Sequence, residues 1–95
     1  MSEAVILEFE GATAEQYAAV NKILGVDADG GGDWPAPLEI HIGTTSDKGL
    51  LVLELWDSRE EQGEFMARLA PALAEAGLPD PVRVEWLTVL GTHTR

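Results

Sequence analysis

Cysteine is absent from the 95 residues of this chain. Its absence excludes disulfide bonds, thiolate-bound metals and cysteine nucleophiles. Basic residues are scarce as well, because 6 lysines and arginines stand against 17 aspartates and glutamates, for a formal net charge of −11. A chain this acidic cannot neutralise phosphate groups, so we expect neither nucleic acid nor a membrane surface as a partner.

Targeting segments and nucleotide-binding motifs are missing too. The opening residues, MSEAVILEFEG, have no basic segment, and their apolar run is too short for a signal peptide or a membrane span, which predicts a cytoplasmic protein. The three glycines at 30–32 lack the lysine that a phosphate-binding loop requires. Neither a G-x-S-x-G nor an H-E-x-x-H motif occurs. We therefore expect no cofactor and no metal.

Six elements follow from the apolar spacing and the capping residues. Thr13 and Gln16 have the spacing of a capping box, Gly25 is placed to end that helix, and Ser58 and Glu61 repeat the box. Pro71 is expected to kink or split the second helix. The predicted elements are a strand over 4–9, a helix over 13–24, hairpin strands over 38–43 and 50–56, a helix from Ser58 to Gly77 and a strand over 82–90.

The order βαββαβ predicts an α+β, ferredoxin-like fold. In it, two helices cover one face of a four-stranded antiparallel sheet. The length accommodates one domain over 1–95. Residues 25–37 are rich in Gly, Asp and Pro and predict a flexible surface loop, or alternatively a lid, because Trp34 is a large apolar side chain within it.

The sheet face away from the helices is predicted to be mixed. Strict alternation places Leu38, Ile40 and Ile42 under the helices, together with Leu51, Leu53 and Leu55. The open face would then carry Ile6, Val52, Trp56, Leu87 and Val89 as an apolar patch, and Glu8, Glu39, His41, Glu54 and Glu85 as a polar cluster. Because such a patch is unfavourable in water, we expect a homodimer that joins two open faces.

A family resemblance rests on residues 35–90. The hairpin end Trp56-Asp57-Ser58-Arg59-Glu60, then Phe65, then Arg68-Leu69-Ala70-Pro71-Ala72-Leu73 and Gly77-Leu78-Pro79 resemble small bacterial proteins of the dimeric α/β-barrel superfamily, in the branch similar to antibiotic-biosynthesis monooxygenases. The resemblance implies that two sheets stack into a barrel. It also implies that a ligand lies between the helices and the sheet.

Activities within that superfamily differ, and this chain departs from some of them. Haem-degrading relatives use an asparagine on the first strand and a histidine on the second helix, and this chain has neither there. Cofactor-free oxygenases use Asn, Trp and Arg or His around an aromatic substrate. Residues that resemble parts of such a site are Tyr17, His41, Trp56, Arg68 and Trp86.

His41 is the candidate catalytic residue, because histidine exchanges protons near neutral pH. The alternative is a structural histidine that is hydrogen-bonded to Glu39 or Glu54 at the dimer interface. Trp56 would either stack on a flat ligand or pack at the barrel rim. The predicted ligand-binding residues are Tyr17, Trp34, Trp56, Phe65 and Trp86. The acidic cluster around His41 would suit a divalent cation, but ordinary strand alternation produces the same pattern.

Three functions stay open at this point. The first is a dimeric barrel protein that binds an apolar or aromatic small molecule. The second is a cofactor-independent monooxygenase of a phenol or quinol, in which the substrate anion reduces oxygen and His41 acts as the base. The third is a non-catalytic accessory protein.

Overall fold

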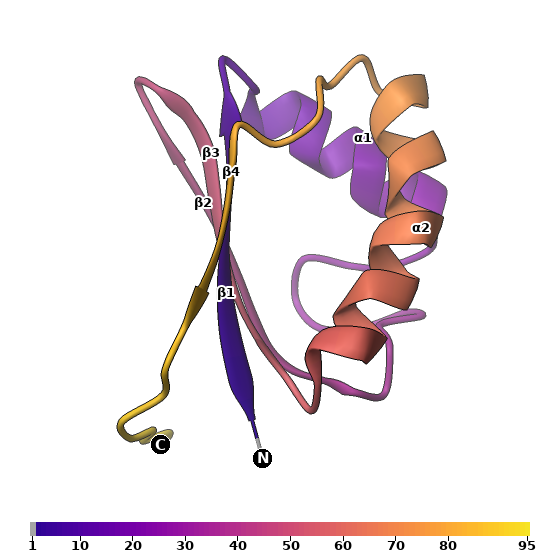
Figure 1. The fold of residues 1–95 in the computed structure, drawn as a ribbon. Coiled ribbons are helices and arrows are strands. Elements are labelled where there is room, and N and C mark those ends of the chain that lie inside the picture. The colour runs from indigo at the N-terminus through magenta and orange to yellow at the C-terminus, as the bar shows by residue number, and fades with distance from the viewer. Residues whose placement is uncertain (1) are drawn as a thin grey trace.

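The computed structural model describes residues 2–95 and contains the six elements in the expected order. Two helices lie side by side on one face of the sheet, and the other face is uncovered (Figure 1). The strand order is β2-β3-β1-β4, with every neighbouring pair antiparallel, as in a ferredoxin-like fold. The elements are β1 (Glu3–Glu10), α1 (Ala14–Leu24), β2 (Leu38–Ser46), β3 (Gly49–Trp56), α2 (Arg59–Glu75) and β4 (Arg83–Leu87).

The ends of α1 follow from local sequence. The Thr13 hydroxyl accepts a hydrogen bond from the Gln16 backbone N–H, and the Gln16 side chain accepts one from the Thr13 backbone N–H, so the predicted capping box is confirmed. At the other end Gly25 adopts a left-handed backbone with φ of 78°, and Val26 N–H donates to the Asn21 carbonyl. This Schellman geometry stops the helix where the sequence predicted.

The second helix is continuous through Pro71. Ser58 caps its start by accepting from the Glu61 backbone N–H, as predicted, but the Glu61 carboxylate accepts from the Ser58 hydroxyl and not from its backbone N–H, so the second capping box is incomplete. The helix then runs unbroken to Glu75, so Pro71 does not split it, and a kink at Pro71 stays a prediction. Near the end Leu78 N–H donates to the Leu73 carbonyl, and Gly77 has a positive φ of 80°. None of the helices within residues 2–95 is long and apolar enough to cross a bilayer.

The sequence-based interpretation places most of the hairpin residues on the wrong face of the sheet. Val5 is paired with Glu54 and Leu7 with Val52, so the even-numbered residues of β3 lie under the helices. On β2 an extra residue at Glu39 forms a bulge between Leu38 and Ile40, which breaks the strict alternation. The covered face therefore carries His41, Val52, Glu54 and Trp56, whereas Ile40, Ile42, Leu51, Leu53 and Leu55 belong to the open face.

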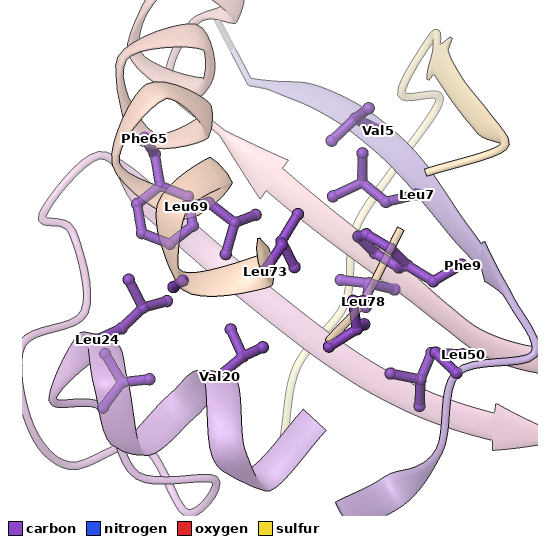
Figure 2. Packing of buried hydrophobic residues seen from close by; sticks show 14 of the residues in the cluster. Val5, Leu7, Phe9, Val20, Leu24, Leu50, Phe65, Leu69, Leu73 and Leu78 are labelled. Carbon is purple, nitrogen blue, oxygen red and sulfur yellow. The ribbon is translucent and has the colours of Figure 1, made fainter. Parts of the chain in front are cut away.

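The core fills the space between the helices and the covered face. Side chains from β1, β3, α1 and α2 point toward one another there (Figure 2). Val5, Leu7 and Phe9 lie under the helices, and Trp56 is fully buried. Along β4, Val84 and Trp86 lie on the same side as Leu7 and Val5, but Val84 stays half exposed at the sheet edge.

The loop over 26–37 folds back on itself after the end of α1, in the lower half of the view (Figure 1). Val26 and Gly32 form an isolated bridge, and Asp33 N–H donates to the Gly25 carbonyl. The indole N–H of Trp34 donates to the Asp27 carbonyl at 3.0 Å, and the Trp34 ring packs against the core. The loop thus carries Trp34 to the edge of the core, while its mobility stays a prediction.

An arginine links the two helices. The Arg68 guanidinium, from α2, donates to the Leu24 carbonyl at the last turn of α1, at 2.8 Å. The same group lies 5.9 Å from the centre of the Phe65 ring. Arg68 therefore supplies a donor to a helix end whose carbonyls lack partners within the helix.

Candidate functional site

His41 lies in the middle of a hydrogen-bonded chain of side chains. Its Nδ1 is 2.7 Å from a Glu54 carboxylate oxygen, and its Nε2 is 2.7 Å from the Tyr17 hydroxyl. The second Glu54 oxygen accepts from the indole N–H of Trp56 at 2.9 Å. The side chains come from α1, β2 and β3, so the fold brings together residues that are far apart in the sequence.

The partners decide which nitrogen of His41 carries the proton. A carboxylate only accepts hydrogen bonds, so Nδ1 is the donor to Glu54. In the neutral ring Nε2 is then an acceptor, and the Tyr17 hydroxyl donates to it. A histidine that is held in this way presents a basic nitrogen in one fixed direction.

This polar chain is surrounded by apolar side chains. Glu54 is 3% exposed and the His41 side chain 16%. The ring of Trp34 covers His41 at a centroid distance of 4.6 Å, and the Tyr17 ring lies 6.0 Å from it and nearly parallel. A carboxylate buried in an apolar core is weak evidence for stability, because its desolvation offsets the hydrogen bonds that it gains. A few polar groups in an otherwise apolar surrounding are instead typical of ligand sites.

An apolar cavity of about 50 Å³ adjoins the hydrogen-bonded side chains of Tyr17, His41 and Glu54. Tyr17, His41, Glu54 and Asn21 are the polar residues of its lining, but the wall itself is almost entirely apolar; residues from both helices and the sheet contribute, among them Leu7, Phe65 and Leu73. A larger surface depression of about 250 Å³ lies against Ala28, Gly30, Leu38 and Glu39. Trp34 and His41 line both spaces, so Trp34 stands between the cavity and the depression.

The predicted ligand-binding residues separate into two groups. Tyr17, Trp34 and Phe65 line the cavity together with His41. Trp56 does not line it: its ring packs against Phe65 at 5.5 Å and its N–H holds Glu54 in place. Trp86 lies elsewhere on the sheet, where Arg59 stacks on its ring at 5.0 Å.

The predicted acidic cluster around His41 does not form. Glu8 and Glu85 are on the open face, where both lie 3.7 Å from Arg83. Glu39 is at the bulge and accepts from the Ser2 hydroxyl. Within residues 2–95 no three His, Asp or Glu side chains are grouped as a metal ion would require. The error came from assuming strict alternation through Glu39.

Two features of the site escaped the sequence analysis. The pairing of His41 with Glu54 was one of two open alternatives, but its position under the helices was not foreseen. The Tyr17 hydroxyl was expected to be part of a lining, not a partner of His41. Period-two spacing in both hairpin strands indicated that His41 and Glu54 share a face of the sheet, but it did not indicate whether that face is the covered or the open one.

A second pair of carboxyl groups lies near the start of α2. The hydrogen bonds from Ser2 and Asp57 hold the pKa of Glu39 below its usual value. The hydrogen bond with Glu39, together with partial desolvation, raises the pKa of Asp57 above its usual value. Both groups are outside the cavity, so this pair belongs to the surface.

Comparisons with known proteins support the fold. No family model and no curated protein matches the chain. Among solved structures, the chain is similar to a protein from Chloroflexus aurantiacus J-10-fl whose name places it among antibiotic biosynthesis monooxygenases. The superposition covers 99% of this chain and 98% of that protein, with a TM-score of 0.65 and 12% sequence identity. At that identity the likeness shows the fold alone. The chain has an antibiotic-biosynthesis-monooxygenase-like fold, as the resemblance predicted.

Proposed function

We propose that this protein binds a small apolar or aromatic molecule between the helices and the sheet, with a hydroxyl group of the molecule at the Tyr17–His41 end. The observation that carries the proposal is the apolar cavity that the hydrogen-bonded chain Glu54–His41–Tyr17 helps to line. Ligand sites in proteins are mostly apolar with a few placed polar groups. This arrangement fits a phenol or enol.

The size of the cavity restricts how such a molecule binds. About 50 Å³ is less than the roughly 150 Å³ that admits benzene. An aromatic ligand therefore needs Trp34 to move aside, which would join the cavity to the surface depression that shares Trp34 and His41. Trp34 acts as a lid in this proposal.

A coloured phenol tests the proposal directly. In mildly acidic buffer free 4-nitrophenol is mostly uncharged, and its phenolate absorbs visible light. We expect the protein to bind 4-nitrophenol in equilibrium dialysis and to produce the phenolate band, while His41→Gln binds without the band. The matched ligand 4-nitroanisole, which lacks the hydroxyl, should give no band. Absence of 4-nitrophenol binding to the unaltered protein would contradict the proposal.

Cofactor-independent oxygenation is the second candidate, and the fixed orientation of the His41 Nε2 favours it. His41 would take the phenol proton, and the electron-rich phenolate would reduce dioxygen. One oxygen atom would replace the hydrogen on a ring carbon and become a quinone carbonyl, and the other would leave as water with the two substrate protons. A dry, apolar cavity favours this step because it protects the intermediate.

His41→Ala separates catalysis from a structural role. Loss of a general base should lower turnover by roughly 10²–10⁴-fold, measured as oxygen consumption with a phenolic substrate. Because His41 faces the helices, we expect its removal to leave the association of two chains unchanged. Full turnover combined with reduced stability would favour the structural histidine. If no phenol binds or reacts, the non-catalytic accessory protein is favoured.

We also propose that the chain forms a homodimer through its open sheet face. The register places seven large aliphatic residues there: Ile6, Ile40, Ile42, Leu51, Leu53, Leu55 and Leu87. Ile42 is 46% exposed, and Leu51 and Leu53 are each 38% exposed. An apolar face of this kind suits a second copy of itself, sheet against sheet. The location of the protein in the cytoplasm stays a prediction.

Native mass spectrometry tests the dimer and the ligand together. A dimer with added mass would support both proposals and identify the ligand class. A bare dimer would support the interface alone. A monomer at micromolar concentration would contradict the interface, because the apolar face would then be exposed to water.

A further inference from the structure

Gly43 lies on the covered face of β2, two residues after His41 and opposite Val52. A Cβ atom built there would lie 2.5 Å from the Tyr17 hydroxyl oxygen and 2.6 Å from Cζ of the same ring. Real Cβ atoms do not approach other atoms that closely. The end of the Tyr17 side chain therefore rests on the backbone of Gly43, in space that any other side chain would fill.

The backbone of Gly43 does not itself call for glycine. Its φ is not positive, unlike that of Gly25 or Gly49. Glycine in a strand weakens the strand and often marks a close approach of another group. Here the group that approaches is Tyr17, so the missing side chain is explained by the hydroxyl that occupies its place.

We propose that Gly43 is a positioning residue that seats the Tyr17 hydroxyl on the Nε2 atom of His41, so that Tyr17 forms the ligand-facing end of a proton path through His41 to Glu54. The hydroxyl is held from two sides, by the Gly43 backbone and by the His41 nitrogen at 2.7 Å. Tyr17 also lines the cavity. The ligand-facing part of this proposal rests on the proposed function, whereas the seating does not.

The proton transfer balances along this path. A ligand O–H bond breaks as its proton passes to the Tyr17 oxygen, and the Tyr17 O–H bond breaks as that proton passes to the His41 Nε2. The imidazolium that forms keeps its Nδ1–H directed at the Glu54 carboxylate. Trp56 supports the far end, because its N–H occupies the other carboxylate oxygen. When the ligand leaves, the reverse transfer returns a proton through Tyr17 to the ligand oxygen and restores the neutral imidazole of His41.

The seating is tested without any ligand. Gly43→Ala should displace the Tyr17 hydroxyl, and Gly63→Ala on α2, where a Cβ meets nothing within 4 Å, is the matched control. Imidazole ¹⁵N NMR resolves two histidines, and exposed His93 serves as an internal reference. In Gly43→Ala, and not in Gly63→Ala, we expect the Nε2 signal of His41 to shift toward the value of an imidazole nitrogen that accepts no hydrogen bond. Identical His41 signals in Gly43→Ala and the unaltered protein would overturn the seating.

A double-mutant cycle tests whether Tyr17 is the group that meets Gly43. We expect Gly43→Ala to lower the melting temperature when Tyr17 is present. In a Tyr17→Leu background, which lacks the hydroxyl and the ring, the same change should lower it little or not at all. An equal decrease in both backgrounds would overturn the proposal.

The proton path is tested with 4-nitrophenol. We expect Tyr17→Phe and Gly43→Ala to bind 4-nitrophenol in dialysis but to lose most of the phenolate band, while Gly63→Ala keeps it. A stronger band in Tyr17→Phe would show that the phenol reaches His41 directly; the proton path would then be wrong and the proposed function would stand. Failure of the unaltered protein to bind would contradict the proposed function and the path, and leave the NMR result on seating intact.

Discussion

The two faces of the sheet reverse the usual distribution of polarity. The covered face includes a carboxylate and an imidazole that are hydrogen-bonded within an apolar core. On the open face, the large aliphatic side chains other than Leu55 are partly in contact with solvent. Buried polar groups and exposed apolar patches are the informative exceptions to ordinary burial. The first exception is the basis of the proposed ligand site, and the second is the basis of the proposed homodimer.

The largest expected effect concerns the open face. Leu53→Glu would place a carboxylate from each copy into the proposed interface, and burying an ion costs several kcal/mol. We expect the dissociation constant to rise by about 1000-fold or more. Sedimentation velocity measures it, with Ile23→Glu on the outer side of α1 as control, because Ile23 is similarly exposed at 42%. Equal dissociation constants for Leu53→Glu and Ile23→Glu would contradict the proposal that the open face forms the interface.

The next effect concerns the covered face. Glu54→Ala leaves the Nδ1–H of His41 and the Nε1–H of Trp56 without an acceptor. A buried donor without a partner costs about 1–3 kcal/mol, so we expect the free energy of unfolding to fall by about 3 kcal/mol in urea titrations. Glu54→Gln keeps one acceptor oxygen and should lose less. If Glu54→Ala lowers the free energy of unfolding by less than about 1 kcal/mol, the buried hydrogen bonds of Glu54 contribute little to stability.

A smaller effect concerns the lid. Trp34 is half-buried, so Trp34→Ala should cost about 1–2 kcal/mol, which is less than the cost of truncating a fully buried Trp. Because Trp34 separates the cavity from the depression, the same change should speed 4-nitrophenol entry in stopped-flow measurements. An unchanged association rate would show that the ligand enters by another route.

The smallest effect is on the exposed pair outside both faces. The raised pKa of Asp57 means that its contribution to stability is favourable at low pH and is lost as pH rises through that pKa. The lowered pKa of Glu39 acts in the opposite direction, with a contribution that is lost as pH falls. Asp57→Asn should therefore raise the melting temperature slightly at pH 7 and leave it unchanged at about pH 3. A large increase in the melting temperature at pH 7 would mean that repulsion between the carboxyl groups of Glu39 and Asp57 destabilises the fold more than their exposed positions imply.

The fold was predictable because its signals are local. Thr13, Gly25 and Ser58 define helix ends through their own neighbours, and the order of elements then restricts the topology. The site was only partly predictable, because the covered face was decided by pairing between strands. Both faces of β3 are apolar, so leucines at 51, 53 and 55 were as suitable for the core as Val52 and Trp56. The bulge at Glu39 has no clear sequence signal.

The bond from Arg68 to the last turn of α1 has a consequence for how the site opens. A cation at that end of a helix also interacts favourably with the negative end of the helix dipole. The two helices are therefore joined by a hydrogen bond at the last turn of α1. Widening the cavity by separating α1 from α2 would break this bond, whereas moving the loop over 26–37 would not. For the proposed ligand, the side where Trp34 lies is therefore the easier way to reach His41, and the two helices keep their contact while Trp34 moves.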